Sequence, residues 1–424
     1  MNYVLGLKCK ECGHRVPATP VHVCEQCFGP YEVEYDYEAM KGKVTRESIA
    51  AGPKSLWRYK DLLPVTKPVT GKHSGMTPLK RAGRLAAELG CKELWIKDDS
   101  CNYPTYSYKE RVVSVAISKA VEFGFDTVGC ASTGNLANST AAHAAEAGIR
   151  CFVMIPHDLE LGKVLGSLVF GPTMVRIRGN YDDVNRLCTE IADKYGWAIV
   201  NVNLRPYYTE GAKTYGFEIA EQLGWRLPQH TVVPTAGGTI LPKIYKAYQE
   251  FIKLGIVEDT GSKIYSAQAA GCNPVVTAIQ KGVDIIEPQK PNTIAKSIAI
   301  GNPADGYYAA QVVRDSGGWG ESATDREIVD AIKLLARTEG IWTEPAGGTT
   351  LAVAMKLIQS GRIPKDESIV VSITGNGLKT VEVVQNELIT PTVIEPKLSE
   401  FDKMFEETQA ASKEKPRKPE LVGA

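Results

Sequence analysis

Residues 102–111 read Asn102-Tyr103-Pro104-Thr105-Tyr106-Ser107-Tyr108-Lys109-Glu110-Arg111, and the interpretation of the chain begins with them. The segment lies between a short apolar run, Leu94 to Ile96, and a region in which Val113, Ile117 and Val121 recur at helical spacing. This pattern predicts a strand, a loop and a helix that begins near Lys109. A lysine at a helix start is usually a solvated surface residue. A functional role for Lys109 is therefore indicated only if the fold places suitable segments beside it.

Three glycine-containing turns supply such neighbours. Ala131-Ser132-Thr133-Gly134-Asn135 and Pro234-Thr235-Ala236-Gly237-Gly238-Thr239 each follow a predicted strand and open a predicted helix, where main-chain N–H groups and hydroxyls can bind an anion. Thr374-Gly375-Asn376-Gly377 ends a late strand. Each turn alone is common in α/β proteins. Together with Lys109 they offer an amine for a Schiff base, an anion site of carboxylate size, a phosphate cradle and a hydroxyl for a ring nitrogen.

Alternation of strand-like and helix-like segments from about residue 38 to about residue 390 predicts the fold class. Strands are expected at 94–96, 127–131, 151–155, 198–202, 231–233, 264–265 and 369–373. Helices are expected at 136–147, closed by Gly148, and at 182–195. This β-α-β order is typical of doubly wound, mostly parallel sheets with helices on both faces, and its length predicts two such three-layer lobes.

Composition excludes several classes of protein. The 424 residues contain 49 Lys and Arg against 49 Asp and Glu, so the zero formal net charge gives no reason to expect a nucleic-acid or membrane partner. We find no apolar run long enough to span a bilayer and no signal peptide at the N-terminus. Four of the ten cysteines cluster and the others are scattered, which favours a reducing, cytoplasmic environment.

The clustered cysteines predict a metal site. Cys9 and Cys12 are separated by two residues, as are Cys24 and Cys27, which is the spacing of a zinc ribbon with four thiolate ligands. Four thiolates leave no open coordination position, so a bound Zn would be structural. The alternative is a degenerate ribbon whose four thiols have lost their metal.

The segment Asn102 to Arg111 resembles the N-P-T-x-S-F-K-D-R signature of threonine synthases, which are fold-type II pyridoxal-phosphate (PLP) enzymes related to the β chain of tryptophan synthase. The resemblance covers roughly residues 5–385 and includes the cysteine ribbon. Further matching segments are 75–79, 132–135, 210–214, 268–271, 300–304 and 374–379. It implies a PLP-dependent lyase that makes threonine from a phosphorylated amino acid, O-phosphohomoserine, and that forms a homodimer.

The resemblance also implies roles for individual residues. Lys109 would hold the cofactor as an internal aldimine and shuttle protons, Asn135 would bond the cofactor's 3′-oxygen, and Thr374 would face the pyridine nitrogen. The cofactor phosphate would lie on the main chain of Ala236, Gly237, Gly238 and Thr239.

Substrate contacts are implied in the same way. Ser132 and Thr133 would hold the substrate carboxylate. Arg205 and Lys213 are candidates for the substrate phosphate. For these two the alternative is a surface arginine and a helix lysine in an ion pair.

The resulting domain organisation has four parts. Residues 1–37 are expected to form the zinc ribbon, 38–110 with 216–390 the large PLP-binding lobe, and 111–215 the small lobe. Residues 391–424, rich in Lys, Glu and Pro, are expected to form a solvated tail with one helix around Leu398 to Gln409.

Several positions depart from the family signature and leave alternatives open. Tyr103 looks inserted, Tyr106, Tyr108 and Glu110 replace the usual Gly, Phe and Asp, and Asn376 stands where His or Asp is common. One alternative is another reaction on the same fold, either a serine/threonine dehydratase or a cysteate synthase that adds sulfite to phosphoserine. A second is a non-enzymatic zinc-ribbon adaptor, although residues 1–37 have only three strong bases, Lys8, Lys10 and Arg15, and no basic patch.

Overall fold

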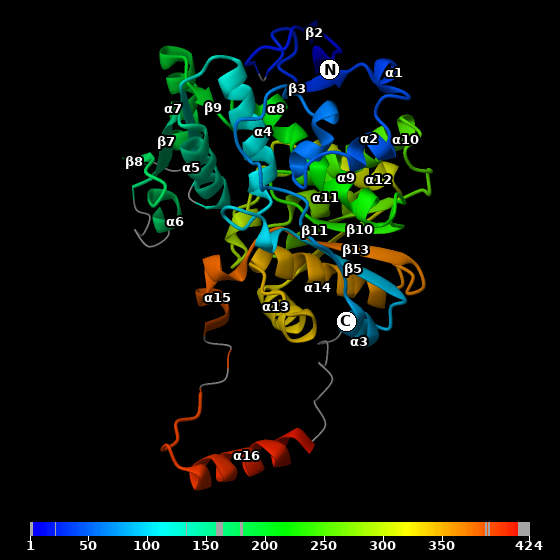
Figure 1. Ribbon diagram of the computed structural model, residues 1–424, viewed down its shortest axis with the longest axis vertical. Helices are drawn as coiled ribbons and strands as arrows, with labels where there is room; N and C mark the ends of the chain where they lie inside the picture. The colour runs from blue at the N-terminus through cyan, green and yellow to red at the C-terminus, as the bar shows by residue number, and fades with distance from the viewer. Residues whose placement is uncertain are drawn as a thin grey trace. The chain divides into compact units, whose positions relative to one another are not determined.

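The computed structural model describes residues 3–21, 23–132, 134–157, 164–178, 181–385, 388 and 391–413. The chain divides into a large unit that ends at Val383 and a small unit that begins at Val384. The large unit contains three sheets (Figure 1). Among the described residues, no helix has the length and apolar content needed to cross a bilayer.

The N-terminal sheet carries the clustered cysteines. Its strands are antiparallel in the order β2-β1-β3 and comprise β1 (Val4–Cys9), β2 (Arg15–Val16) and β3 (Tyr31–Tyr35). In β3 the side chains of Tyr31, Val33 and Tyr35 are buried and the two glutamates between them are less so. This period-two pattern packs one face of the small sheet against the rest of the protein.

The large sheet has six strands in the order β12-β11-β10-β13-β5-β4. They are β4 (Leu79–Arg81), β5 (Glu93–Asp98), β10 (His230–Pro234), β11 (Lys263–Ala269), β12 (Gly320–Ala323) and β13 (Ser368–Ile373). All pairings are parallel except that of β4 with β5. Every residue of β10 and β13 is buried, because helices cover both faces (Figure 1).

The second sheet is wholly parallel, in the order β8-β7-β6-β9. Its strands are β6 (Thr127–Ala131), β7 (Arg150–Pro156), β8 (Thr173–Ile177) and β9 (Ala198–Ile199). Cys130 and Val153 belong to the same core cluster as the alanines of α5 (Asn135–Ala147). Ala131 and Met154 face the opposite way and pack with the apolar side of α7 (Tyr181–Tyr195).

The other helices lie between these strands in the sequence, except α15 and α16, which follow β13. Their bounds are α1 Tyr37–Met40, α2 Arg46–Ala50, α3 Gly83–Leu89, α4 Lys109–Glu122, α6 Leu165–Leu168, α8 Arg205–Glu210, α9 Lys213–Gln222, α10 Ile240–Lys253, α11 Pro274–Lys281, α12 Gly306–Asp315, α13 Asp325–Glu339, α14 Pro345–Gln359, α15 Glu382–Gln385 and α16 Leu398–Lys413. Short 3₁₀ turns lie at Leu56–Leu62, Asp99–Cys101, Lys296–Ile298 and Gly377–Thr380. In the small unit, the predicted tail helix is present as α16.

The predicted fold class is confirmed: the chain has mixed α/β architecture with two mostly parallel sheets. Strand β6 has the predicted bounds, and α5 ends at Gly148 in the left-handed conformation, as predicted. Strand β9 is shorter than expected, because the chain turns at Ile199, where the N–H of Val202 donates to the Ile199 carbonyl. The domain boundaries given above stay predictions.

Candidate active site

Lys109 opens helix α4, and the loop before it is held against the end of strand β13. The main-chain N–H of Tyr108 donates to the carbonyl oxygen of Thr374 over 2.8 Å, and Ser107 forms an isolated bridge with Gly375. Lys109 is half-buried, and its Nζ donates to the hydroxyl of Tyr208 at 3.2 Å. Among the described residues no carboxylate forms an ion pair with this amine. Its nitrogen is therefore positioned but lightly bonded, as a covalent attachment point requires.

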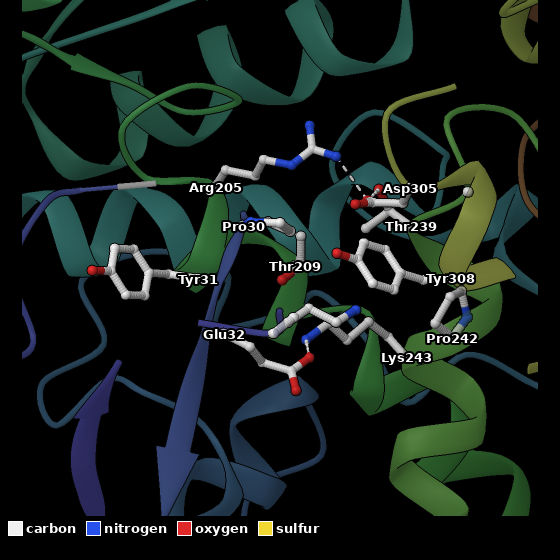
Figure 2. Close-up of a pocket in the computed structure, with 12 residues that line it drawn as sticks. Pro30, Tyr31, Glu32, Arg205, Thr209, Thr239, Pro242, Lys243, Asp305 and Tyr308 are labelled. Carbon is white, nitrogen blue, oxygen red and sulfur yellow. Dashed lines mark hydrogen bonds and ion pairs between the residues drawn. The ribbon is translucent and has the colours of Figure 1, made fainter. Parts of the chain in front are cut away.

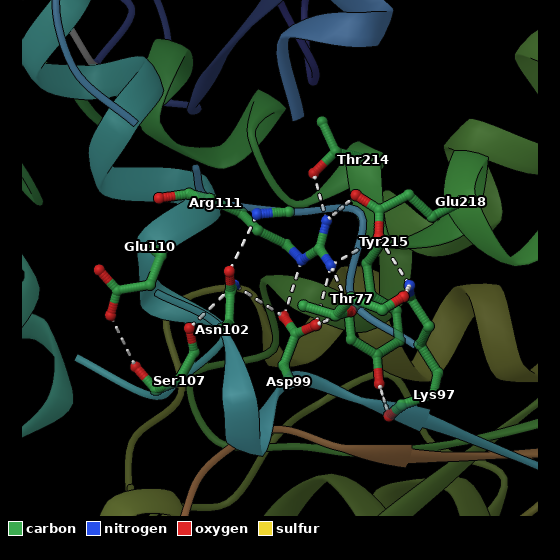
Figure 3. A network of polar contacts seen from close by, with 12 residues as sticks. Thr77, Lys97, Asp99, Asn102, Ser107, Glu110, Arg111, Thr214, Tyr215 and Glu218 are labelled. Atoms are coloured by element: carbon green, nitrogen blue, oxygen red, sulfur yellow. Dashed lines mark hydrogen bonds and ion pairs between the residues drawn. The ribbon is translucent and has the colours of Figure 1, made fainter. Parts of the chain in front are cut away.

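Arg111, two residues further on, is the centre of a buried polar network (Figure 3). Its guanidinium bonds Asp99 through Nε at 2.7 Å and Nη2 at 2.8 Å, and bonds Glu218 through Nη1 at 2.5 Å and Nη2 at 2.8 Å. Lys97 donates to the same Glu218 carboxylate at 2.6 Å. Burial alone would raise the pKa of Glu218, but the charges of Arg111 and Lys97 lower it to about 2. The network ties the first turn of α4 to β5 and α9.

Asn135, the first residue of α5, is held between two charged side chains. Its amide nitrogen donates to both carboxylate oxygens of Glu344, at 3.1 and 3.0 Å, and its amide oxygen accepts from Lys379 Nζ at 2.7 Å. Glu344 is only 3% exposed, and burial raises its pKa while burial lowers the pKa of Lys379. The two partners fix which way the amide of Asn135 faces.

The loop Ala236 to Thr239 joins β10 to the 14-residue helix α10 and packs against Asp305 (Figure 2). The N–H of Asp305 donates to the Gly237 carbonyl at 2.8 Å, and the Thr239 hydroxyl donates to the Asp305 carboxylate at 2.7 Å. Gly238 has φ of +91°, and a Cβ there would lie 2.6 Å from the Asp305 main chain. Only glycine fits this position, because the main chain of Asp305 packs directly against it.

Of the other predicted site residues, Thr374, Ser132 and Arg205 each lie at the end of a strand or helix. Thr374 is buried where β13 ends. Ser132 follows β6, and its hydroxyl accepts from the N–H of Gly134 at 3.4 Å. Thr133 lies outside the described residues. Arg205 opens α8 and forms an ion pair with Asp305 at 2.8 Å, beside the Gly238 loop.

Lys213 lies among carboxylate and carbonyl oxygen acceptors. It is fully buried, and its Nζ contacts the Leu62 carbonyl at 2.8 Å, Glu250 at 2.9 Å and Glu210 at 2.7 Å. These three acceptors use all three hydrogens of the ammonium group, so none remains for a substrate. This geometry favours the ion-pair interpretation of Lys213. Arg205 is the predicted phosphate ligand that lines a pocket.

The four cysteines converge as the spacing predicts. Their Sγ atoms all lie within 4.8 Å of one another, with Cys9 and Cys27 3.5 Å apart and Cys12 and Cys24 3.7 Å apart. Thiolates of a tetrahedral zinc site with Zn–S bonds of about 2.3 Å would be separated by roughly 3.8 Å. The donor set and its spacing therefore fit one zinc ion.

Sequence reasoning missed three residues that touch the predicted site. Tyr208 contacts Lys109, and Glu344 and Lys379 contact Asn135. Tyr208 lies in a buried helix and shows no distinguishing pattern. Glu344 did offer a signal, because it is a charged residue directly before Pro345 at the start of the otherwise apolar helix α14.

The sequence is similar to known protein families and to individual known proteins. The family described as "Pyridoxal-phosphate dependent enzyme" matches residues 71–375, and one described as "NinF protein" matches residues 8–32 in the cysteine segment. The chain is 37% identical over 404 residues to a threonine synthase of Methanocaldococcus jannaschii, covering 94% of this chain and 99% of that protein. It is 40% identical over 393 residues to a threonine synthase of Methanosarcina acetivorans, covering 92% and 96%.

Solved structures share the fold. Maize serine racemase aligns with a TM-score of 0.62 at 21% identity, covering 78% of this chain and 93% of that one. Threonine deaminase isoform 2 of Solanum lycopersicum aligns with a TM-score of 0.63 at 19% identity, covering 76% and 91%. At these identities the likeness concerns the fold alone.

Proposed function

Because this chain belongs to the pyridoxal-phosphate-dependent enzymes and, among them, to the threonine synthase family, we propose that it converts O-phospho-L-homoserine and water to L-threonine and phosphate. The reaction combines elimination of phosphate from the γ carbon with addition of water at the β carbon. One observation carries the proposal. The similarity to threonine synthases spans more than nine-tenths of the chain, and the lysine of the shared signature opens a helix with its amine lightly bonded.

The residues present fit the cofactor. Lys109 offers an amine with no carboxylate partner in the described part of the chain, the Gly238 loop offers main-chain N–H groups at a helix start, and Thr374 offers a hydroxyl at the end of β13. PLP, when bound, supplies an electron sink that stabilises negative charge on the substrate carbons. Lys109 would hold it covalently, Asn135 would bond its 3′-oxygen, Ala236 to Thr239 would bind its phosphate and Thr374 would face its ring nitrogen.

The chain's own residues would then bind substrate and move protons. Lys109, once released, takes and returns protons at the substrate's α and β carbons, and the Tyr208 hydroxyl at 3.2 Å holds its nitrogen in place. Ser132 and Thr133 would bind the substrate carboxylate. Arg205 would bind the substrate phosphate, for which its guanidinium offers paired hydrogen bonds.

Product identification tests this function. Purified protein should release phosphate from phosphohomoserine and form threonine in equal amounts. Phosphoserine with sulfite, free serine and free threonine are the comparison substrates. A preference for phosphoserine with sulfite, or deamination of the free amino acids, would replace the proposed reaction with one of the two alternatives on the same fold.

We also propose a structural zinc ion on Cys9, Cys12, Cys24 and Cys27. The convergence of the four sulfur atoms supports it. Elemental analysis of protein purified under reducing conditions should give one zinc per chain. A metal-free protein with full activity would contradict the proposal.

Homodimer formation and a cytoplasmic location complete the proposal. All ten cysteines are free in the structure, which suits a reducing compartment. Light scattering of the purified enzyme should give twice the chain mass of 46.1 kDa.

A further inference from the structure

Lys10, next to the cysteine Cys9, extends from the ribbon into the pocket that contains the Gly238 loop. The pocket's lining includes Lys10 from the ribbon, Arg205 and Thr209 from α8, and Gly238 and Thr239 from the loop (Figure 2). The Nζ of Lys10 lies 3.4 Å from the centre of the Tyr308 ring. The ribbon therefore supplies a cation, together with Pro30, Tyr31 and Glu32, to a pocket that it shares with α8, α10 and the Gly238 loop.

Three cations and two carboxylates line the pocket, and a third carboxylate, that of Glu210, lies behind it and bonds Lys243. Its cations are Lys10, Arg205 and Lys243, and its carboxylates are Glu32 and Asp305. Lys243 is paired with Glu32 at 2.6 Å and with Glu210 at 2.5 Å, and Arg205 is paired with Asp305 at 2.8 Å. Within the described part of the chain, Lys10 has no carboxylate at ion-pair distance. Its charge, added to the main-chain N–H groups at the start of α10, leaves the pocket suited to an anion.

Ion pairs fix the ribbon to the helix that follows the loop. Glu32, on strand β3, bonds Lys243 and also Lys246 at 3.3 Å, and both lysines lie on α10. The Tyr207 hydroxyl of α8 donates to the Thr19 carbonyl of the ribbon at 2.7 Å. The position of Lys10 relative to Gly238 is thus set by contacts on both helices, so that Lys10 is held in place before a ligand arrives.

We propose that Lys10 of the ribbon binds the phosphate group of a phosphate monoester in this pocket, beside Arg205 if the ester is the substrate and beside the Gly238–Thr239 main chain if it is the cofactor. The inference rests on the proposed function, which brings two phosphate esters to this loop. The ester is carried by the substrate or by the cofactor. In either case the zinc ribbon contributes a binding residue to the active site as well as stability.

Substitution of Lys10 tests the subsite, and Lys8 gives a matched control. Lys8 is an exposed lysine on ribbon strand β1, two residues before Lys10 and on the other side of Cys9, and does not line the pocket. Lys10→Met should raise, about tenfold to thirtyfold, either the KM for phosphohomoserine and the inhibition constant of inorganic phosphate in zinc-replete holoenzyme, or the dissociation constant of PLP; this is the loss expected for one charge-assisted hydrogen bond. Lys8→Met should leave all of these constants unchanged, and Lys10→Arg should retain most of the binding.

Titration of the cofactor-free enzyme with PLP, followed by its visible absorbance, separates the two sources of phosphate. A raised KM with unchanged PLP affinity assigns the subsite to the substrate. Weakened PLP binding with unchanged KM assigns it to the cofactor. If Lys10→Met matches Lys8→Met in KM, phosphate inhibition and PLP affinity, or lowers only thermal stability or zinc content, then Lys10 merely fastens the ribbon to Tyr308 and the inference is wrong.

The proposed function and the subsite can fail separately. A wild-type enzyme that makes no threonine rejects the function, and isothermal titration with inorganic phosphate then still tests the pocket. An active wild type with an unaffected Lys10→Met variant rejects the subsite alone.

Discussion

Lys109 and Arg111 are two residues apart at the start of one helix, and their surroundings are opposite. Arg111 is fully buried and makes paired hydrogen bonds with Asp99 and Glu218 (Figure 3). Among the described residues, the Lys109 amine makes one hydrogen bond, to Tyr208, and lies near the rings of Tyr108 and Tyr208. A saturated buried network has one low-energy arrangement, and a lightly bonded amine is free to react. The comparison indicates that the rigidity of Arg111 is what allows Lys109 to be both exact in position and chemically available.

Substitution of Lys109, the reactive residue of the two, should have the largest effect of all, and this effect is on turnover. Lys109→Ala should lower kcat by about a thousandfold or more, because proton transfer by a positioned group alone contributes roughly 10²- to 10⁴-fold. The variant should also lose the covalently held cofactor. Turnover and reduction of the purified protein with borohydride measure the two effects. A reducible PLP adduct on Lys109→Ala would place the attachment on another lysine, and Lys97 would be the first to examine.

Substitution of Arg111 should lower the free energy of unfolding. Arg111→Leu leaves the carboxylates of Asp99 and Glu218 buried without their main cation, and breaking a buried pair in this way typically costs about 3–5 kcal/mol. The free energy of unfolding from urea titration measures it. Arg150→Ala, which removes an exposed pair with Asp126, is the control and should unfold like the wild type. Equal stability of both variants would mean that the Arg111 network is not what holds the helix start.

This contrast also explains what the sequence could predict. Buried parallel strands such as β6 were found because their apolar runs are continuous, and the glycine turns marked the active-site edge of each sheet. Strand β8, whose residues are half-buried or exposed, lacks such a run and was not expected. The partner of Asn135 is Glu344, 209 residues away, and no local spacing connects them. Spacing locates a reactive residue, whereas its long-range polar neighbours require the fold.

Acid should weaken the Arg111 network in a defined window. The pKa of Glu218 is about 2 in the folded protein against an ordinary value of 4.5. A lowered carboxyl pKa contributes stability that is complete above the ordinary value and is lost as the pH falls from about 4.5 towards 2. Glu218→Gln should therefore be less stable than wild type at pH 7, by on the order of 2 kcal/mol for a charge-assisted bond, and should lose less stability between pH 5 and pH 2.5. Parallel pH profiles of unfolding for the two proteins would show that Glu218 does not titrate with folding.

The smallest expected effect concerns the hydrogen bond between the Lys109 amine and Tyr208. Tyr208→Phe keeps the ring and removes the hydroxyl that accepts from Nζ, so kcat should fall about tenfold, the value of one hydrogen bond to a charged group. KM and the unfolding midpoint should change little, because the aromatic packing stays. Tyr207→Phe is the matched control, since its hydroxyl donates to the Thr19 carbonyl of the ribbon and not to the active site. That variant should lower stability slightly and leave kcat unchanged. If Tyr208→Phe retains full kcat, or if it loses only stability while Tyr207→Phe loses kcat, then Lys109 needs no fixed hydrogen-bond partner. Its position then depends on the Arg111 network alone.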